Sequence, residues 1–142
     1  MTEPVWIRQD AVFTIHEEAL LLHGGLEGVR DLGLLESALA RPKNLFAYSE
    51  QTPSLAQLAA SYGKGIVANH PFVDGNKRTA FIVSVTFLRL NGLELTATKE
   101  DRVLTFWSLA AGEITEDQLA RWFERNTGPR GLPAGPLFHR RR

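Results

Sequence analysis

The segment AFIVSVTFLRL, residues 80–90, is apolar on nearly every side and constrains the fold more than any other part of the chain. A helix that is hydrophobic all round is stable only where other elements surround it. The β-branched residues would also suit a strand, but the length of the segment and the Asn91-Gly92 pair that follows favour a helix. We therefore expect a buried helix at the centre of the molecule.

Two amphipathic helices are predicted near the N-terminus. The first covers about residues 8–23, where apolar residues recur at helical spacing, and it ends at Gly24-Gly25. The second begins after Asp31, which can cap it, and ends at Pro42. The stretch 41–53 lacks helical periodicity and is predicted to be an ordered loop or a short hairpin.

Further helices are predicted on both sides of the central one. A third helix runs over about residues 54–69, and residues 93–97 are expected to be extended. The chain shows no internal repeat and no βαβ alternation, so we predict an all-α fold. Two pairs resemble capping boxes that begin two more helices: Thr98 with Asp101, and Thr115 with Gln118.

The chain is predicted to divide into a domain over residues 1–127 and a flexible tail over residues 128–142. The tail, GPRGLPAGPLFHRRR, holds three glycines and three prolines and too little apolar surface to offset its ordering entropy. Leu137 and Phe138 beside the arginines could form a docking motif or simply lie in solvent. Without the tail, twelve basic side chains face sixteen acidic ones, which argues against direct nucleic-acid binding by the domain.

The composition excludes several other classes of protein. A chain of 142 residues is most simply one domain. No apolar run reaches the roughly 18 residues that a membrane span needs, and the N-terminus lacks the basic and apolar regions of a signal peptide. The absence of cysteine excludes disulfides and thiolate metal sites. A cytoplasmic protein is expected.

The most polar stretch, NHPFVDGNKRT at residues 69–79, lies at the junction of the third helix and the central helix. Because His70 precedes a proline, the chain is expected to leave the helix there. The first N–H groups of the next helix lack intrahelical partners, and Gly75 lets the backbone approach a ligand. Together with Lys77 and Arg78, they are predicted to bind an anion such as phosphate.

Two further side chains at this junction suggest a reaction. Asp74 would be misplaced beside an anion unless a divalent cation such as Mg²⁺ lay between them. His70 is the group nearby that can take a proton from a hydroxyl at neutral pH. Phosphoryl or nucleotidyl transfer requires a general base, a carboxylate that binds a metal ion and a set of groups that bind phosphate. From the residues alone, an ordinary helix–turn–helix corner fits equally well.

The nine residues HPFVDGNKR resemble the signature of the Fic/Doc family, H-P-F-x-[D/E]-G-N-[G/K]-R, and match it at every fixed position. The similarity covers about residues 5–126, where GVRDLGLLESALARP, FLRLNG and AAGEIT also resemble the Doc (death-on-curing) branch. The resemblance implies a compact bundle of about six helices around a buried central helix, with a short flap loop or hairpin. It also implies the toxin of a toxin–antitoxin system.

The resemblance implies a role for each residue of the signature. His70 would be the general base for the target hydroxyl, and Asp74 would hold Mg²⁺. Phe72 would be the buried structural anchor of the loop. The nucleotide and phosphate groups would be bound by Gly75, Asn76, Lys77 and Arg78.

Lys77 and Phe81 indicate the branch of the family. Fic adenylyltransferases typically read G-N-G-R-x-x-R, with a glycine in place of Lys77 and an arginine in place of Phe81. The lysine would crowd the approach of the phosphates, and the missing arginine removes a phosphate clamp. Both features are shared with Doc. The resemblance thus implies a kinase that uses ATP and Mg²⁺ to phosphorylate a threonine of elongation factor Tu and so arrests translation.

Two other functions stay open at this point. The first is a Fic-type adenylyltransferase, which would transfer AMP to the target hydroxyl. The second is a non-catalytic binding module whose basic tail engages nucleic acid or an acidic partner. The intact motif argues against the second.

The resemblance also implies a flap and a partner. The flap, which aligns the target backbone, would be KNLFAYSE at residues 43–50, with Arg41 as a further candidate. The inhibitory motif [S/T]-x-x-x-E-[G/N] has only imperfect matches, at 14–19 and 96–101. We therefore expect no brake within the chain and a separate, Phd-like antitoxin whose C-terminal segment folds onto the toxin.

Overall fold

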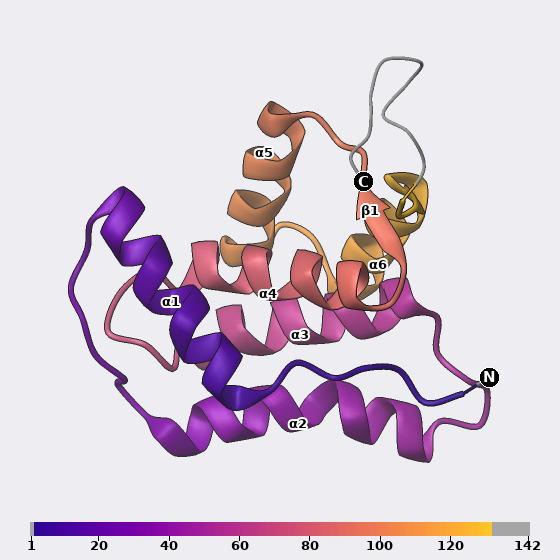
Figure 1. The fold of residues 1–142 in the computed structure, drawn as a ribbon, viewed down its shortest axis with the longest axis horizontal. Coiled ribbons are helices and arrows are strands. Elements are labelled where there is room, and N and C mark those ends of the chain that lie inside the picture. The colour runs from indigo at the N-terminus through magenta and orange to yellow at the C-terminus, as the bar shows by residue number, and fades with distance from the viewer. Residues whose placement is uncertain (1, 132–142) are drawn as a thin grey trace.

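The computed structural model describes residues 2–131, which form six helices and one small sheet (Figure 1). The prediction of an all-α bundle is confirmed. No helix within residues 2–131 is long and apolar enough to span a membrane. The helices are α1 (Gln9–His23), α2 (Leu32–Tyr48), α3 (Leu55–Asn69), α4 (Asn76–Leu90), α5 (Lys99–Ala110) and α6 (Glu116–Arg125), and the antiparallel strands are β1 (Leu93–Leu95) and β2 (Thr127–Pro129).

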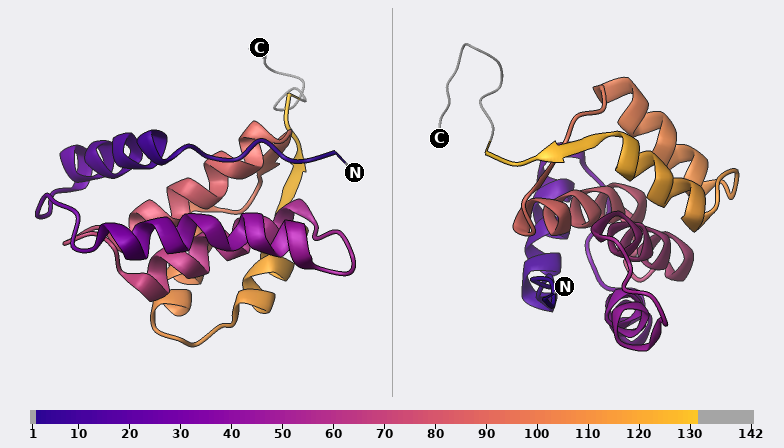
Figure 2. Two further views of the ribbon diagram at one scale, coloured as in Figure 1. Left: turned by 90° about the horizontal axis from the view of Figure 1, so that it is seen from below. Right: turned by 90° about the vertical axis from the view of Figure 1, so that its right-hand side faces the viewer.

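The centre of the bundle is shared by α4 and α3, and α3 packs against α2, α4 and α6 (Figure 2). The prediction that α4 is buried is confirmed, and α3 is buried as well, with the small residues Gly63 and Gly65 among its buried positions. Those residues let neighbouring helices come close. A Cβ atom at Gly63 would lie 2.8 Å from Ser84 Oγ of α4, and one at Gly65 would lie 3.3 Å from the backbone of Ala38 in α2.

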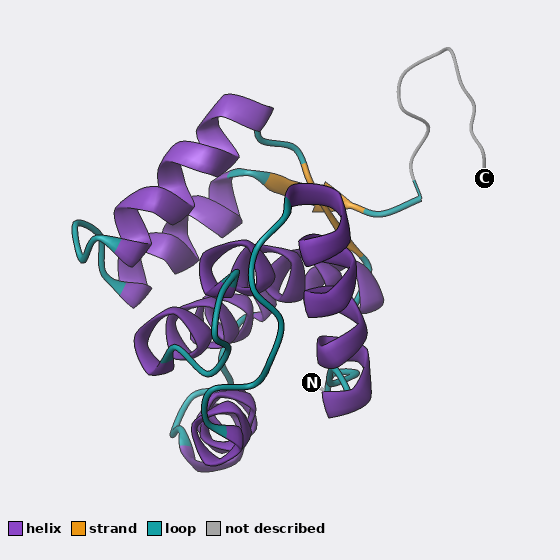
Figure 3. Ribbon diagram, turned by 90° about the vertical axis from the view of Figure 1, so that its left-hand side faces the viewer, coloured by secondary structure: helices purple, strands orange, loops and turns teal. Residues whose placement is uncertain are grey.

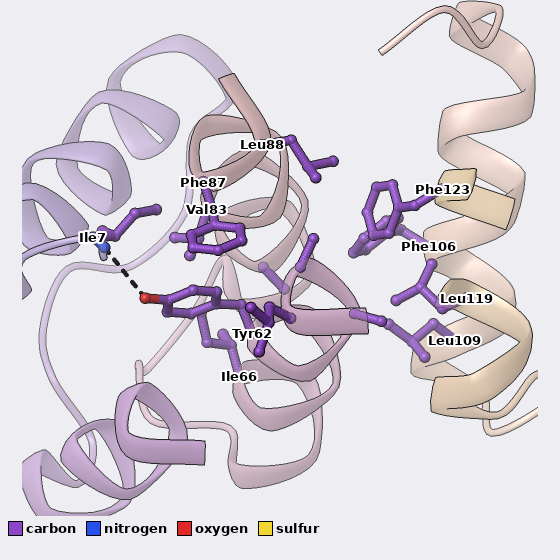
Figure 4. Packing of buried hydrophobic residues seen from close by; sticks show 14 of the residues in the cluster. Ile7, Tyr62, Ile66, Val83, Phe87, Leu88, Phe106, Leu109, Leu119 and Phe123 are labelled. Carbon is purple, nitrogen blue, oxygen red and sulfur yellow. Dashed lines mark hydrogen bonds between the residues drawn. The ribbon is translucent and has the colours of Figure 1, made fainter. Parts of the chain in front are cut away.

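Aromatic and aliphatic side chains fill the core on both sides of α3 (Figure 4). Tyr62 is fully buried and lies beside Phe87, with 5.1 Å between the ring centroids. Its hydroxyl oxygen accepts a hydrogen bond from the Ile7 N–H at 3.2 Å, which attaches the extended N-terminal segment to the core. Burial raises the pKa of Tyr62 to about 12. On the side of α5 and α6, Phe106 and Phe123 complete the core.

The expected loop or hairpin at 41–53 is wrong, because α2 continues through Pro42 to Tyr48. A proline inside a helix costs about 3 kcal/mol. Here Pro42 is buried on the same face as Leu35 and Ala38, so tertiary packing outweighs that cost. The segment proposed as a flap, 43–50, is therefore mostly the last turns of α2.

One of the two predicted capping boxes is complete, and the other has only one of its two hydrogen bonds. At α6, the side chain of Thr115 accepts from the Gln118 N–H, and the Gln118 side chain accepts from the Thr115 N–H. At α5, Thr98 accepts from the Asp101 N–H. The Asp101 carboxylate accepts instead from the Trp122 indole N–H at 2.9 Å, so it joins α5 to α6.

The first residues assigned to the tail belong to the described structure. Gly128 pairs with Glu94 in the sheet, and the Arg130 N–H donates to the Gly92 carbonyl at 2.8 Å. The remainder of the predicted tail, 132–142, including its docking-motif candidate, lies outside the described residues. The division of the chain at residue 127 stays a prediction.

Candidate active site

The loop between α3 and α4, which carries the candidate site residues, meets the loop between α1 and α2 (Figure 3). The N–H groups of Arg30 and Asp31 both donate to the Pro71 carbonyl, at 2.7 and 3.0 Å. The Val73 N–H donates to the Gly28 carbonyl at 3.0 Å. These backbone hydrogen bonds fix the loop that carries the motif against a second, distant part of the chain.

His70 ends α3 in a left-handed conformation, with φ 52° and ψ 54°. Within residues 2–131 it is the only residue other than glycine with a positive φ. Such a conformation costs about 1–2 kcal/mol and persists only where the surroundings impose it. The Arg30 guanidinium imposes it in part, because it donates to the carbonyls of His70 at 2.7 Å and Asn69 at 2.9 Å. The exposed imidazole is thereby held at the start of the loop.

Phe72 and Asn76 hold the middle of the loop. Phe72 is fully buried beneath it. The Asn76 side-chain oxygen accepts from the Phe72 N–H, and its amide nitrogen donates to the Phe72 carbonyl, both at 2.9 Å. Both polar atoms of the Asn76 side chain are thus hydrogen-bonded to the loop backbone. This buried side chain therefore holds the backbone that forms the anion site.

The N-terminus of α4 presents backbone donors at the same place. Gly75 precedes the helix with φ 77°, a conformation that favours glycine, and no side chain caps the helix there. The first N–H groups of α4 therefore remain available to an anion. Lys77 lies in the first turn, and its ammonium nitrogen is 3.5 Å from the centroid of the Trp107 ring.

The Asp74 carboxylate is held by two backbone donors. Oδ2 accepts from the Leu26 N–H at 3.0 Å, and Oδ1 accepts from the Gly75 N–H at 2.9 Å. These two hydrogen bonds, the one from Leu26 above all, lower the pKa of Asp74 from its ordinary value, so the group is ionised at neutral pH. Each oxygen keeps a second lone pair that can bind a cation.

The donor set suits a hard divalent ion only when phosphates share in its coordination. In the part of the chain that the structure describes, no three His, Asp or Glu side chains gather to hold a metal. Mg²⁺ commonly takes one or two protein carboxylates and completes its shell with substrate phosphates and water. Asp74 beside the N-terminus of α4 fits that pattern.

A cavity of about 440 Å³ brings these groups together. Every predicted site residue except the buried Phe72 lines it. The opposite wall comes from α5 and was missed by the sequence analysis, although Val103 and Trp107 are an i, i+4 pair of large apolar residues left exposed. Neither Arg41 nor the residues 43–50 line it: Arg41 donates to Glu116 and to the Ser61 carbonyl. The lining residues are His70, Asp74, Gly75, Asn76, Lys77, Arg78, Phe81, Arg102, Val103, Phe106 and Trp107.

Comparisons with known proteins match this part of the chain. The model of the Fic/DOC family matches residues 6–88, which include the loop and most of α4. Toxin Doc of Mycolicibacterium smegmatis is 45% identical over 74 residues, which are 52% of this chain and 57% of that relative. Protein kinase doc of Escherichia phage P1 is 33% identical over 122 residues, 86% of this chain and 95% of that relative.

Proposed function

The chain belongs to the Fic/DOC family, and we propose that it is a toxin with kinase-type activity that transfers the γ-phosphoryl group of ATP to a protein hydroxyl. The observation that carries this proposal is the single cavity that gathers a histidine, an ionised carboxylate and the cationic N-terminus of α4. Two relatives, a toxin and a protein kinase by their names, support it.

Each group in the cavity has a role in such a transfer. His70 would accept the proton of the target hydroxyl as its oxygen forms a bond to the γ-phosphorus, and ADP would leave as the β–γ bond breaks. The N–H groups of α4, with Lys77 and Arg78, would hold and neutralise the phosphates. Asp74 would hold Mg²⁺, which supplies charge neutralisation at the phosphate oxygens.

Lys77 and Phe81 support phosphoryl transfer over transfer of AMP. The Lys77 ammonium lies inside the cavity over Trp107, where it adds a full positive charge beside the helix N-terminus. Phe81 also lines the cavity, at the position where adenylyltransferases of the family place a second arginine. A site with one lysine at this point and no second arginine is suited to a terminal phosphate that Lys77 can contact.

The target and partners proposed for this chain follow from its resemblance to the Doc branch. We propose a threonine of elongation factor Tu as the acceptor, in the cytoplasm, and a Phd-like antitoxin as the inhibitor. The domain itself is not expected to bind nucleic acid, because its charge is net negative.

The type of reaction can be tested without assuming the target. A bacterial lysate is incubated with the protein, Mg²⁺ and ATP labelled at either the γ- or the α-phosphorus, and protein-bound label is measured. Transfer of the γ label alone is expected. Transfer of the α label would show an adenylyltransferase, and transfer of neither label would favour a non-catalytic binding module.

A further inference from the structure

His16 is a buried histidine of α1 that has no part in the mechanism proposed above. Its side chain reaches the loop between α3 and α4 and does not line the cavity. Nε2 lies 2.8 Å from the backbone carbonyl oxygen of Asp74. A carbonyl oxygen can only accept, so Nε2 carries the proton and donates. The residue is 4% exposed.

The same ring also packs against Phe72 and lies close to Gly75, two residues that shape the loop. It stacks on Phe72 with 3.9 Å between the centroids and 11° between the planes. A Cβ atom at Gly75 would lie 3.7 Å from Cδ2 and Nε2 of His16. One side chain of α1 therefore contacts the anchor Phe72 and the carboxylate-bearing residue Asp74, and it lies beside the glycine before α4.

The peptide that joins Asp74 to Gly75 determines two features of the cavity. It sets the direction of the Asp74 side chain, whose carboxylate is otherwise held by the Leu26 and Gly75 N–H groups. It also sets the start of α4, since Gly75 is the residue before the first helical turn. The carbonyl oxygen of this peptide accepts the hydrogen bond from His16 Nε2.

We propose that His16 is a positioning residue: its Nε2–H bond holds the Asp74–Gly75 peptide so that the carboxylate and the first N–H groups of α4 face the phosphates. The expected effect of His16 on the reaction rate rests on the proposed function, whereas its expected effect on the position of the loop does not. Partners of this kind, one step removed from a metal ligand, typically contribute about 10–100-fold to activity or metal affinity.

Two substitutions separate the hydrogen bond from the packing. His16→Gln keeps an N–H donor at a similar reach and removes the ring, whereas His16→Phe keeps a ring over Phe72 and removes the donor. If the hydrogen bond positions the loop, His16→Phe lowers kcat/KM for ATP by about 10–100-fold, and His16→Gln retains most of the activity. If only packing matters, the order of the two variants is reversed.

A second measurement reports on the loop in the absence of nucleotide and target. The Leu26 N–H is bonded to Asp74 Oδ2, and the Gln57 N–H is bonded to Ser54 Oγ at the end of α3 that is opposite to the loop. Amide hydrogen exchange measured by NMR should be faster at Leu26 in His16→Phe, unchanged there in His16→Gln, and unchanged at Gln57 in both. Equal protection of Leu26 in His16→Phe and wild type, or lost protection in His16→Gln, would overturn the proposal even if the protein proved not to be a kinase.

Discussion

Replacing His70 with asparagine is expected to lower the rate of phosphoryl transfer by about 10²–10⁴-fold, the usual contribution of a general base. Asparagine tolerates the left-handed conformation that this position requires. The hydrogen bonds that the Arg30 guanidinium donates to this loop reach backbone carbonyls, so the substitution preserves them. The amide cannot take a proton from a hydroxyl, so activity is lost while the loop is retained. Label transfer from γ-labelled ATP measures the effect.

A matched control is available on α1. His23 is exposed in the last turn of that helix and does not line the cavity, so His23→Asn should leave the rate unchanged. Thermal unfolding of both variants should remain close to that of wild type. If His70→Asn transferred phosphate at the wild-type rate, His70 would not be the base.

Replacing Phe72 with alanine is expected to lower the free energy of unfolding by about 3–5 kcal/mol, as for other fully buried phenylalanines. The ring is completely buried, and it packs against His16 and, edge to face, against Phe13. Since domains are typically stable by only about 5–15 kcal/mol, this loss is a large share of the total. Urea denaturation measures it.

The neighbouring residue provides the control for this second prediction. Val73 follows Phe72 directly and is 44% exposed, so Val73→Ala should change the free energy of unfolding by no more than about 0.5 kcal/mol. If the free energy of unfolding fell by similar amounts in the two variants, the loop would have no buried anchor. Its order would then arise from the backbone hydrogen bonds alone.

The sequence predicted the helices whose ends carry local signals. Gly24 ends α1, and Asp31 caps α2 by accepting from the Leu34 N–H. The continuation of α2 through Pro42 could not be predicted in this way. The proline is locally unfavourable, and its burial against other helices, which outweighs that cost, is not visible in a short stretch of sequence.

The candidate site was predictable where its residues are contiguous in the chain. Residues 70–78 meet at one cavity because a turn and the start of a helix place them there. The contributions of α1 and α5 depend on packing across the bundle. His16 is 58 positions from Asp74, and Trp107 is brought to Lys77 only by the fold. A histidine on a helix face and an exposed tryptophan carry no local sign of those contacts.

We propose a kinase whose general base is His70 and whose substrate is elongation factor Tu. The most direct measurement is the intact mass of purified elongation factor Tu after incubation with ATP, Mg²⁺ and either the wild-type protein or His70→Asn. We expect the mass of one phosphate to be added by the wild type and nothing by the variant. Addition of AMP, an unmodified factor, or equal phosphorylation by both proteins would contradict this account.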